Sequence, residues 1–469
     1  MKVHLIGICG TAMATLAAMF KQEGFYVQGS DKEIYPPMSE FLAEQRISVL
    51  EGYRADHISN DIDFVVIGNS VSRGNPEVEE VLDRKIRYFS LPEAIRDHFL
   101  WGRKTIVAAG THGKTTTASV IGWLLAKGNL DPSFMVGGIA LNFGTSFRVG
   151  SGSTFVIEGD EYDSAFFDKT AKFLKYIPDI VIINNVEFDH ADIYPDLDSI
   201  RVAFRRLITL IPRGGLLLLG GDSRDALDLG SVAHCKVETF GLSDSLDWQA
   251  KEIAITPSGT KFDVYRRGSL FERVEVPLLG AFNVRNVIGS IAAVSAVGLP
   301  QKMLTEGLSQ FRGVRRRLEL RGTVGGIDVY DDFAHHPTAI AETLKAVKEA
   351  YPGRRLWAVF EPRSATACSR VFESEISKAL SLGDEVVLGK VFRSKFVTGK
   401  RLSEKQVVSE LVFRGTHAQY IPEVKEIITT VVSESRDGDV VVIMSNGNFE
   451  GIHGRLLKAL GEKRNTSLV

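Results

Sequence analysis

One stretch of the chain limits its fold more than any other: a short apolar run that leads through a glycine-bearing loop into a helical pattern. Residues 106–109 are apolar and predict a buried strand, Gly110-Thr111-His112-Gly113 form the loop, and residues 114–117 open the helix. Such a loop directs backbone N–H groups and a helix N-terminus at phosphate oxygens. Lys114 can neutralise the terminal phosphates, and the Thr115 hydroxyl can hold Mg²⁺. The stretch predicts an ATP site in a strand–loop–helix unit of a parallel sheet.

This interpretation has one structural alternative. The usual P-loop pattern has glycine where Ala108 stands, so the match fails at its first position, and a plain glycine turn would give a similar sequence. The order Gly-Lys-Thr at 113–115 favours the nucleotide. The expected ATP-binding residues are Gly110, Thr111, His112, Gly113, Lys114, Thr115 and Thr116.

Length and composition bound the class of protein. With 469 residues, of which 44% are hydrophobic, the chain is expected to form several globular domains. The net charge of −2 excludes a broad basic surface for nucleic acid. Three cysteines without metal-type spacing favour a reduced compartment. The first residues read as a strand rather than a signal peptide, and no apolar run reaches the ~20 residues of a membrane span. We therefore expect a cytoplasmic protein without membrane insertion; no sequence feature specifies an oligomeric state.

Three segments of alternating strand and helix patterns follow one another, at residues 1–103, 104–321 and 322–469. Strands are expected at 3–6, 25–28, 64–67, 106–109, 154–157, 180–183, 327–330, 356–360, 385–388 and 440–444, and residues 248–277 predict a small antiparallel excursion. The expected fold class is α/β in three domains. The first and third domains are Rossmann-like, and the central domain has a parallel sheet of the P-loop ATPase type.

The first segment contains a second candidate for phosphate binding. A strand leads into Gly7-Ile8-Cys9-Gly10, a helix begins at Thr11, and Asp31 follows about twenty residues later, where a ribose-binding acid would stand. The full dinucleotide fingerprint needs two glycines that this loop lacks. NAD binding and a purely structural turn therefore stay open beside another nucleotide diphosphate. Ser70 follows a later strand at the same expected sheet edge.

Acidic residues follow the strand at 154–157 and suggest a metal site. Residues 158–163 carry four carboxylates, which suit Mg²⁺, and nucleotide chemistry requires a metal ligand from a strand next to the P-loop. A solvated acidic loop is the alternative. His190, beyond the strand at 180–183, is either the ligand of a second metal or a core histidine. We expect Thr115, Glu158 and His190 as metal ligands.

Two charged runs lie near the start of the third segment. Arg315-Arg316-Arg317 is either a solvated face or the source of an arginine that reaches a phosphate. Residues 331–337, which read Asp-Asp-Phe-Ala-His-His-Pro, follow a strand, and their acid and imidazole content suggests a substrate site. Their spacing matches no common zinc motif.

Taken together, these motifs resemble those of the Mur ligase family over nearly the whole chain. The set comprises residues 110–116, 158–163, 187–190, 283–286, 315–317 and 331–337. The family joins an amino acid or peptide amine to a UDP-muramyl carboxylate and cleaves ATP to ADP and phosphate. Its three domains hold the UDP-sugar, ATP and the amine, in that order. The resemblance implies further ATP contacts from Asn283, Asn286 and Arg317, and UDP-sugar contacts from Gly7, Gly10, Thr11, Asp31 and Ser70.

Within the family, residues 7–13 and 29–31 resemble the branch that acts on UDP-N-acetylmuramate. One member adds L-alanine, and another re-attaches the recovered murein tripeptide L-alanyl-γ-D-glutamyl-meso-diaminopimelate in peptidoglycan recycling. Residues 361–364, Glu-Pro-Arg-Ser, and 444–447, Met-Ser-Asn-Gly, match the pattern of the tripeptide member. The alanine member carries a His-Arg-Tyr-x-x-Arg cluster, and Ser364 and Ala367 stand here at the places of its two arginines.

The resemblance also implies a mechanism. The lactyl carboxylate attacks the γ-phosphate of ATP, and the tripeptide amine then displaces phosphate from the acyl phosphate. Catalytic roles fall to Lys114, Glu158, His190 and His335, with Mg²⁺ as the cofactor, and amine-substrate contacts fall to Asp332, His335, Arg363 and Ser364, with Arg370 and Arg393 as further candidates. Ligation of L-alanine is the alternative; a P-loop ATPase switch and an NAD-dependent dehydrogenase are distant alternatives.

Overall fold

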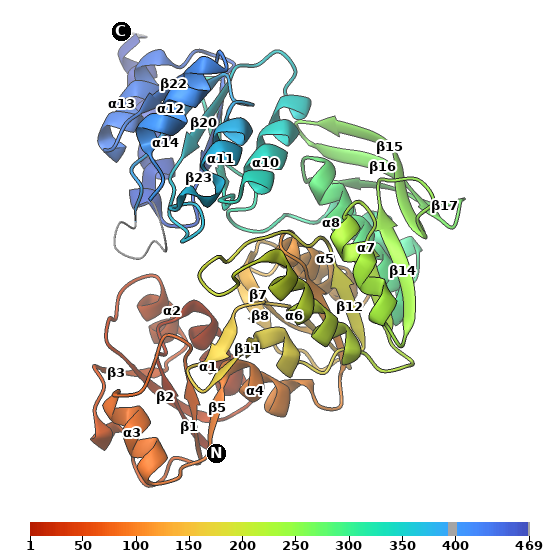
Figure 1. Ribbon diagram of the computed structural model, residues 1–469, viewed down its shortest axis with the longest axis vertical. Helices are drawn as coiled ribbons and strands as arrows, with labels where there is room; N and C mark the ends of the chain where they lie inside the picture. Colours follow the sequence, from red (N-terminus) through yellow and green to blue (C-terminus); the bar gives the residue numbers. More distant parts are fainter. Residues whose placement is uncertain (393–400, 468–469) are drawn as a thin grey trace. The chain divides into compact units, whose positions relative to one another are not determined.

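The computed structural model describes residues 1–392 and 401–467, and Arg393 lies outside them. The chain forms two compact units. Unit 1 consists of Met1–Val186, Asp198–Trp248 and Gly289–Gly307, and unit 2 consists of Glu187–Leu197, Gln249–Ile288 and Leu308–Val469. Figure 1 labels their helices and strands.

The first sheet of unit 1 is parallel, with the strand order β3-β2-β1-β4-β5. Its strands are β1 (Lys2–Ile6), β2 (Tyr26–Asp31), β3 (Ser48–Glu51), β4 (Phe64–Ile67) and β5 (Tyr88–Ser90); its helices are α1 (Thr11–Gln22), α2 (Met38–Glu44), α3 (Pro76–Asp83) and α4 (Leu91–Ile95). The chain steps outward from β1 to β3 and then returns to β4 on the other side of β1. The loops after β1 and β4 therefore flank the switch point, where sheets of this type bind ligands.

A second sheet of unit 1 has the order β14-β13-β12-β6-β9-β7-β8 and is parallel except for β8. Its strands are β6 (Lys104–Ala109), β7 (Ser133–Ala140), β8 (Thr145–Arg148), β9 (Thr154–Glu158), β12 (Ile180–Ile183), β13 (Leu216–Gly220) and β14 (Lys236–Gly241), joined by α5 (Lys114–Lys127), α6 (Leu197–Thr209), α7 (Arg224–Asp228) and the hairpin of β10 (Asp163–Ala165) and β11 (Asp168–Ala171). Every residue of β12 and β13 is buried, as central strands covered on both faces require.

Unit 2 contains an antiparallel group and a six-stranded sheet. The group consists of β15 (Trp248–Thr256), β16 (Gly259–Arg266) and β17 (Ser269–Val276). Along the chain, α8 (Ala281–Val297) and α9 (Lys302–Ser309) follow, and their residues from Gly289 to Gly307 belong to unit 1. The six-stranded sheet has the order β18-β19-β23-β20-β21-β22 and is parallel except for β18. Its strands are β18 (Glu319–Val324), β19 (Ile327–Asp332), β20 (Leu356–Phe360), β21 (Glu385–Leu388), β22 (His417–Tyr420) and β23 (Val440–Met444).

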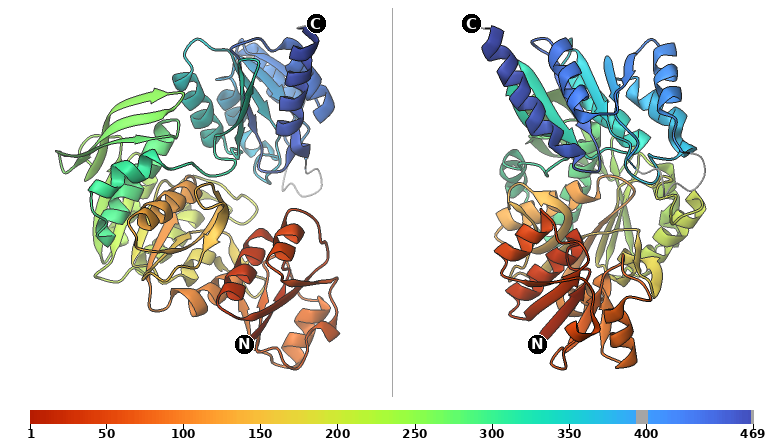
Figure 2. Two further views of the ribbon diagram at one scale, coloured as in Figure 1. Left: turned by 180° about the vertical axis from the view of Figure 1, so that it is seen from behind. Right: turned by 90° about the vertical axis from the view of Figure 1, so that its left-hand side faces the viewer.

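Helices cover both faces of this six-stranded sheet (Figure 2). They are α10 (Pro337–Ala350), α11 (Glu373–Leu380), α12 (Glu404–Phe413), α13 (Val424–Glu434) and α14 (Ile452–Ser467). Successive side chains of a strand point to opposite faces. Ala358 and Phe360 accordingly pack into the core with α10, α11 and α12, whereas Trp357 and Val359 pack into the core with α13 and α14.

The expected α/β class is confirmed, and β4, β12, β20, β21 and β23 have the expected bounds. The antiparallel excursion is also confirmed, because β16 pairs antiparallel with β17. Two expectations were wrong in detail: residues 29–31 and 331–332, expected to follow strands, are paired residues of β2 and β19. The boundary expected at 321/322 falls inside β18, a strand that was not predicted. Among the helices of residues 1–392 and 401–467, none has both the length and the apolar character to span a membrane.

Candidate active site

The glycine loop after β6 leads into the N-terminus of α5, which is suited to bind an anion. Gly113 is the N-cap of α5 with a left-handed φ of 85°, and no described side chain caps the helix. Gly110, with φ at 116°, must lack a side chain, because a Cβ there would lie 2.9 Å from the backbone nitrogen of Asn184. Since the first N–H groups of a helix have no acceptor within the helix, this end of α5 suits phosphate.

Two asparagines that follow β12 hold the loop. The Thr111 N–H donates to the Asn185 carbonyl (3.0 Å), and the His112 N–H donates to Asn185 Oδ1 (2.8 Å). The Asn184 amide donates to Thr117 Oγ1 (3.0 Å) at the start of α5. Both asparagines directly follow the apolar strand β12, and no sequence motif indicated that they would shape the phosphate loop.

Lys114 faces a buried carboxylate. Its Nζ donates to Glu161 Oε1 (2.9 Å) and to the carbonyl oxygens of Gly110 (2.8 Å) and Thr111 (3.0 Å). Burial lowers the pKa of Lys114, but the charges of Glu161 and Glu158 outweigh burial and raise the pKa above its ordinary value. Lys114 is therefore a permanent cation within the loop. Glu161, 2% exposed, was part of the expected acidic run but was not singled out.

Thr115 and Glu158 form a pair of oxygen ligands. The Thr115 hydroxyl donates to Glu158 Oε1 (3.1 Å), and Glu158 Oε2 accepts the N–H of Gly137 (2.7 Å). The pair arises because β9, which ends at Glu158, lies next to β6 in the sheet. A hydroxyl and a carboxylate are hard ligands, so the residues present fit Mg²⁺. His190, the third expected ligand, belongs to unit 2.

The first glycine loop is closed by the neighbouring strand. The N–H groups of Gly7 and Ile8 both donate to the carbonyl of Ser30 (2.8 and 3.1 Å), and the Cys9 N–H donates to Asp31 Oδ2 (2.8 Å). These amides are occupied by the protein itself. The carboxylate of Asp31, expected to contact the UDP-sugar, thus bonds to the loop.

Donors for a ligand lie around the start of α1. Its N-cap Gly10 has no side chain to cap the helix, and Thr11 is exposed as the first helical residue. Ser70 is exposed after β4, and its Oγ lies 3.9 Å from the position that a Cβ on Gly7 would occupy. The structure thus brings Gly7, Gly10, Thr11 and Ser70 to one sheet edge.

In unit 2, the segment with His190 bonds to the start of α10 and to the loop after β20. The Thr338 hydroxyl donates to Glu187 Oε2 (2.6 Å), and the Thr366 hydroxyl donates to Asp189 Oδ1 (3.1 Å). His190 has a left-handed φ of 56°, and its N–H donates to Asp189 Oδ1 (2.7 Å). A positive φ is uncommon outside glycine, so the backbone here is tightly shaped.

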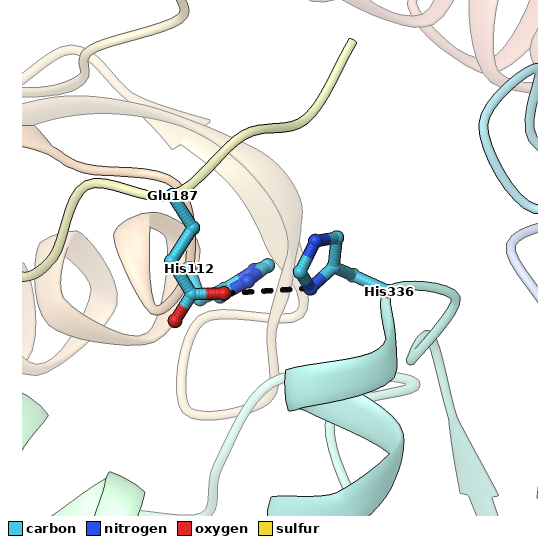
Figure 3. A group of neighbouring side chains, drawn as sticks. All are labelled: His112, Glu187 and His336. Atoms are coloured by element: carbon cyan, nitrogen blue, oxygen red, sulfur yellow. Dashed lines mark ion pairs between the residues drawn. The ribbon is translucent and has the colours of Figure 1, made fainter. Parts of the chain in front are cut away.

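His336 shapes the same region, although only its neighbour His335 was predicted. It is the N-cap of α10: Nδ1 accepts the Thr338 N–H (3.3 Å), and Nε2 donates to the Phe188 carbonyl (3.1 Å). The Glu187 carboxylate lies 3.6 Å from Nδ1 (Figure 3). The available signal was the order His-Pro-Thr, because proline favours the first position of a helix.

Two of the three arginines at 315–317 have defined surroundings. Arg316 Nη2 donates to the carbonyls of Ser445 and Gly447, both at 2.5 Å. The Arg317 guanidinium lies 4.8 Å from the centre of the Phe333 ring. Arg316 therefore fixes the loop after β23, and Arg317 remains the arginine predicted to contact phosphate.

Asp332 and His335 differ in exposure. Asp332 is 6% exposed, and its oxygens accept the N–H groups of Leu318 (2.6 Å) and Ala334 (2.8 Å). Burial raises the pKa of Asp332, although Arg317 and these amides act in the opposite direction. His335 is partly exposed, with Nδ1 3.0 Å from the carbonyl of Phe333. Of the two side chains, that of Asp332 is buried and that of His335 is partly exposed.

The asparagines predicted to contact ATP form a local pair in α8. Asn286 Nδ2 donates to Asn283 Oδ1 (3.3 Å), and Asn283 Nδ2 donates to the Leu279 carbonyl (2.9 Å). Both residues are 4% exposed. Their contact with ATP stays a prediction.

Arg363 is held on both faces at the carboxyl end of β20. Its guanidinium carbon lies 3.6 Å from the centre of the Phe392 ring, and a Cβ on Gly447 would lie 2.2 Å from Arg363 Nε. Glu361 Oε2 lies 3.8 Å from Nη1. The Ser364 hydroxyl accepts the Ala367 N–H (3.0 Å) and so closes a turn. Such a planar fork can bind a carboxylate through its edge.

Comparison with known families and proteins shows which family contains this chain. The Mur ligase family, catalytic domain, matches residues 2–100, the Mur ligase middle domain matches 108–294, and the Mur ligase, glutamate ligase domain, matches 316–447. The UDP-N-acetylmuramate–L-alanyl-γ-D-glutamyl-meso-2,6-diaminoheptandioate ligase of Escherichia coli (strain K12) is 39% identical over 99% of each chain. The UDP-N-acetylmuramate–L-alanine ligase of Lachnoclostridium phytofermentans is 30% identical over 97% of each.

A solved structure agrees with these sequence relatives. The crystal structure of a murein peptide ligase from Psychrobacter arcticus 273-4 matches with a TM-score of 0.71 and 37% identity, over 98% of this chain and 99% of the other. Three family matches in chain order and full-length relatives above 30% identity leave neither a P-loop switch nor a dehydrogenase as an alternative. The chain belongs to the Mur ligase family.

Proposed function

We propose that the protein is an ATP-dependent ligase that joins L-alanyl-γ-D-glutamyl-meso-diaminopimelate to UDP-N-acetylmuramate in peptidoglycan recycling. Family membership supports the reaction class, and the 39% identity to the Escherichia coli ligase supports the substrate pair. The first domain (1–103) would hold the UDP-sugar, the second (104–321) ATP, and the third (322–469) the peptide. ATP and a UDP-sugar as substrates favour a cytoplasmic location.

The proposed reaction has two steps. An oxygen of the lactyl carboxylate attacks the γ-phosphorus of ATP, and ADP leaves. The alanyl amine then attacks the acyl carbon, the amide bond forms, and phosphate and a proton leave. Both steps depend on charge stabilisation at fixed positions.

The proposed roles follow the geometry of each residue. Lys114 and the N-terminus of α5 would bind the transferring phosphate. Thr115 and Glu158 would hold Mg²⁺, which when bound would neutralise phosphate charge. His190 stays the predicted ligand of a second cation, and His335 would orient the amine. Because their polar atoms bond to the chain itself, Asp31 and Asp332 would shape loops rather than contact substrate.

One observation carries the choice of tripeptide over L-alanine: the guanidinium of Arg363 is fixed between Gly447 and Phe392, just beyond the carboxyl end of β20, where it could bind a peptide carboxylate. Ala367, at the place of an arginine in the alanine member, is 1% exposed and packs in the core, so that position cannot hold an exposed cation. This site therefore lacks the two arginines with which the alanine member would bind a lone alanine.

Phosphate release with ATP, Mg²⁺ and UDP-N-acetylmuramate, plus either L-alanine or the tripeptide, tests the proposal. We expect release to require both the sugar and an amine, with kcat/KM higher for the tripeptide. Arg363→Ala should raise the tripeptide KM and leave those for ATP and the sugar nearly unchanged. Arg414→Ala, which removes an exposed arginine at the end of α12, is the matched control. A higher kcat/KM for L-alanine would assign the chain to alanine ligation.

A further inference from the structure

A fully buried carboxylate lies beneath the first glycine loop and takes no part in the chemistry described above. Glu77 stands in the first turn of α3 and is 0% exposed. The helix begins there because the Asn75 side chain accepts the N–H groups of Glu77 (2.9 Å) and Val78 (3.3 Å) and Pro76 follows it. A negative charge at this end of a helix is stabilised by the helix dipole.

Four donors converge on this carboxylate. Oε2 accepts from His4 Nε2 (3.1 Å) and from the Ser30 hydroxyl, and Oε1 accepts from His57 Nδ1 (2.7 Å) and the Arg54 N–H (3.3 Å). They come from β1, β2 and the segment after β3. Because a carboxylate has about four acceptor positions, Glu77 is saturated. Burial raises its pKa, but the hydrogen bonds from His4 and Ser30 outweigh burial, and the pKa lies below its ordinary value.

His4 links Glu77 to β2. Its Nε2 lies 3.1 Å from Glu77 Oε2, and its Nδ1 lies 3.2 Å from the amide nitrogen of Gln28. His4 is 0% exposed. The cluster is thus one buried carboxylate held by two imidazoles, a hydroxyl and a backbone N–H.

Ser30 connects the cluster to the glycine loop. Its side chain bonds to Glu77, and its carbonyl oxygen accepts the N–H groups of Gly7 (2.8 Å) and Ile8 (3.1 Å). The next residue, Asp31, accepts the N–H of Cys9 through its side chain (2.8 Å). The position of residues 30–31 therefore sets the path of residues 7–9 and the place where α1 begins.

From this chain of contacts we infer that Glu77 is a positioning residue for the UDP-sugar: it fixes Ser30, and through Ser30 the loop and helix start that bind the nucleotide diphosphate. The inference rests on the proposed function of the first domain. Glu77 touches no substrate atom, and its influence passes through one hydroxyl and two backbone hydrogen bonds.

Glu77→Gln tests the inference because it preserves the shape of the side chain but replaces one acceptor oxygen with a donor NH₂ group. A glutamine amide NH₂ would face two donors, at either the Ser30 or the His57 side, so at least one donor loses its acceptor and the cluster holds Ser30 less firmly. We expect the Kd and KM for UDP-N-acetylmuramate to rise about tenfold, the scale of one unsatisfied buried group. The KM values for ATP and the tripeptide should stay within about twofold.

Ser30→Ala is the second variant, since it cuts the link and leaves Glu77 with its other donors. It should raise the same two constants by a smaller factor, and it decides the question if Glu77→Gln does not fold. Glu80→Gln is the control, because it removes the charge of a partly exposed ion pair with Arg84 on the same helix (3.3 Å). It should leave the Kd and KM for the sugar and the KM values for ATP and the tripeptide unchanged.

Calorimetric titration of each folded variant with UDP-N-acetylmuramate, and separately with ATP, separates the outcomes. Weaker sugar binding with intact ATP binding supports the inference. Unchanged sugar binding in both variants overturns it, as does an equal loss of both ligands, which would indicate general damage. If the wild-type protein itself does not bind the sugar, the proposed function fails, independently of the role of Glu77.

Discussion

Lys114 is the residue on which phosphoryl transfer should depend most. It is held by Glu161 and two loop carbonyls and is charged at all physiological pH values. Lys114→Ala removes that charge from the developing transition state, so we expect ligation to fall by at least ~10²-fold. Phosphate release at saturating substrates measures the effect. Lys127→Ala, in the last turn of the same helix, should keep wild-type activity. A folded Lys114→Ala enzyme within a few-fold of wild type would contradict the assignment.

Gly447 is required by the side chain that lies on it. A Cβ at this position would lie 2.2 Å from Arg363 Cδ and Nε, so Gly447→Ala must displace the guanidinium. Loss of one charge-assisted hydrogen bond should raise the tripeptide KM by about tenfold or more, with the KM for ATP unchanged. Gly454→Ala, where nothing lies within 4 Å of the new Cβ, is the control and should not reduce activity. Equal kinetics for both variants would remove Arg363 from the peptide site.

At the residue level, sequence reasoning singled out groups that lie in short motifs and missed groups whose partners lie far away in the sequence. Lys114, Thr115 and Glu158 sit in short motifs, and the structure brings Thr115 and Glu158 into contact. Glu77 and His4, by contrast, are separated by 73 positions, and neither belongs to a recognisable pattern. A buried ionic cluster depends on the tertiary fold, and a single sequence does not reveal it.

Strands show the same division at the level of elements. The central strands β12, β20 and β23 are fully buried and appear as unbroken apolar runs, so their bounds were predicted. The edge strands β3, β18 and β22 were missed, and so was the central strand β13, although it is fully buried. The residues of the three edge strands are mostly partly or fully exposed, and their polar composition resembles that of loops. Because these edge strands are exposed to solvent, they lack the unbroken apolar run from which a strand is predicted.

The π-helical turn at Arg96–Leu100, which continues α4, carries a histidine into an aromatic core. The His98 ring stacks on Phe64 at 4.9 Å and meets Phe20 edge-on at 5.1 Å, and among the described residues its buried Nε2 has no hydrogen-bond partner. Burial lowers the pKa of His98, Arg87 acts in the same direction, and Asp97 opposes both. The neutral ring is therefore the form that the fold favours.

The sign of the pH effect follows. Below the ordinary histidine value of about 6.5, the unfolded chain binds a proton that the folded chain resists, so the free energy of unfolding falls as pH falls. Above that value His98 contributes no pH dependence. His98→Phe should lose less thermal stability than wild type between pH 7.5 and 5.5, measured by circular dichroism. His234→Gln, at an exposed site, should follow wild type. Parallel curves for His98→Phe and wild type would exclude a buried neutral histidine.

At the level of the whole molecule, the order of the three sheets along the chain followed from the alternation of patterns, but the grouping of segments did not. Residues 187–197 lie in the middle of the sequence and belong to unit 2, where Thr338 binds Glu187 across 151 positions. No local pattern encodes such a contact, because it depends on where a distant helix starts. The three expected metal ligands are accordingly divided: Thr115 and Glu158 belong to unit 1, and His190 belongs to unit 2.

Hydrogen exchange can assign each substrate to its own sheet edge in the intact protein. A saturating ligand slows exchange through openings that require its release, by about 100-fold at 100 times Kd. UDP-N-acetylmuramate should protect the first turn of α1 more than Gly7, Ile8 and Cys9, whose amides are already bonded within the protein. The tripeptide should protect residues 361–364 and 445–447. L-Alanine at the same concentration is the control and should protect the latter segments less. Protection of the first sheet by the tripeptide, or of residues 361–364 by the sugar alone, would reverse the proposed assignment of substrates to domains.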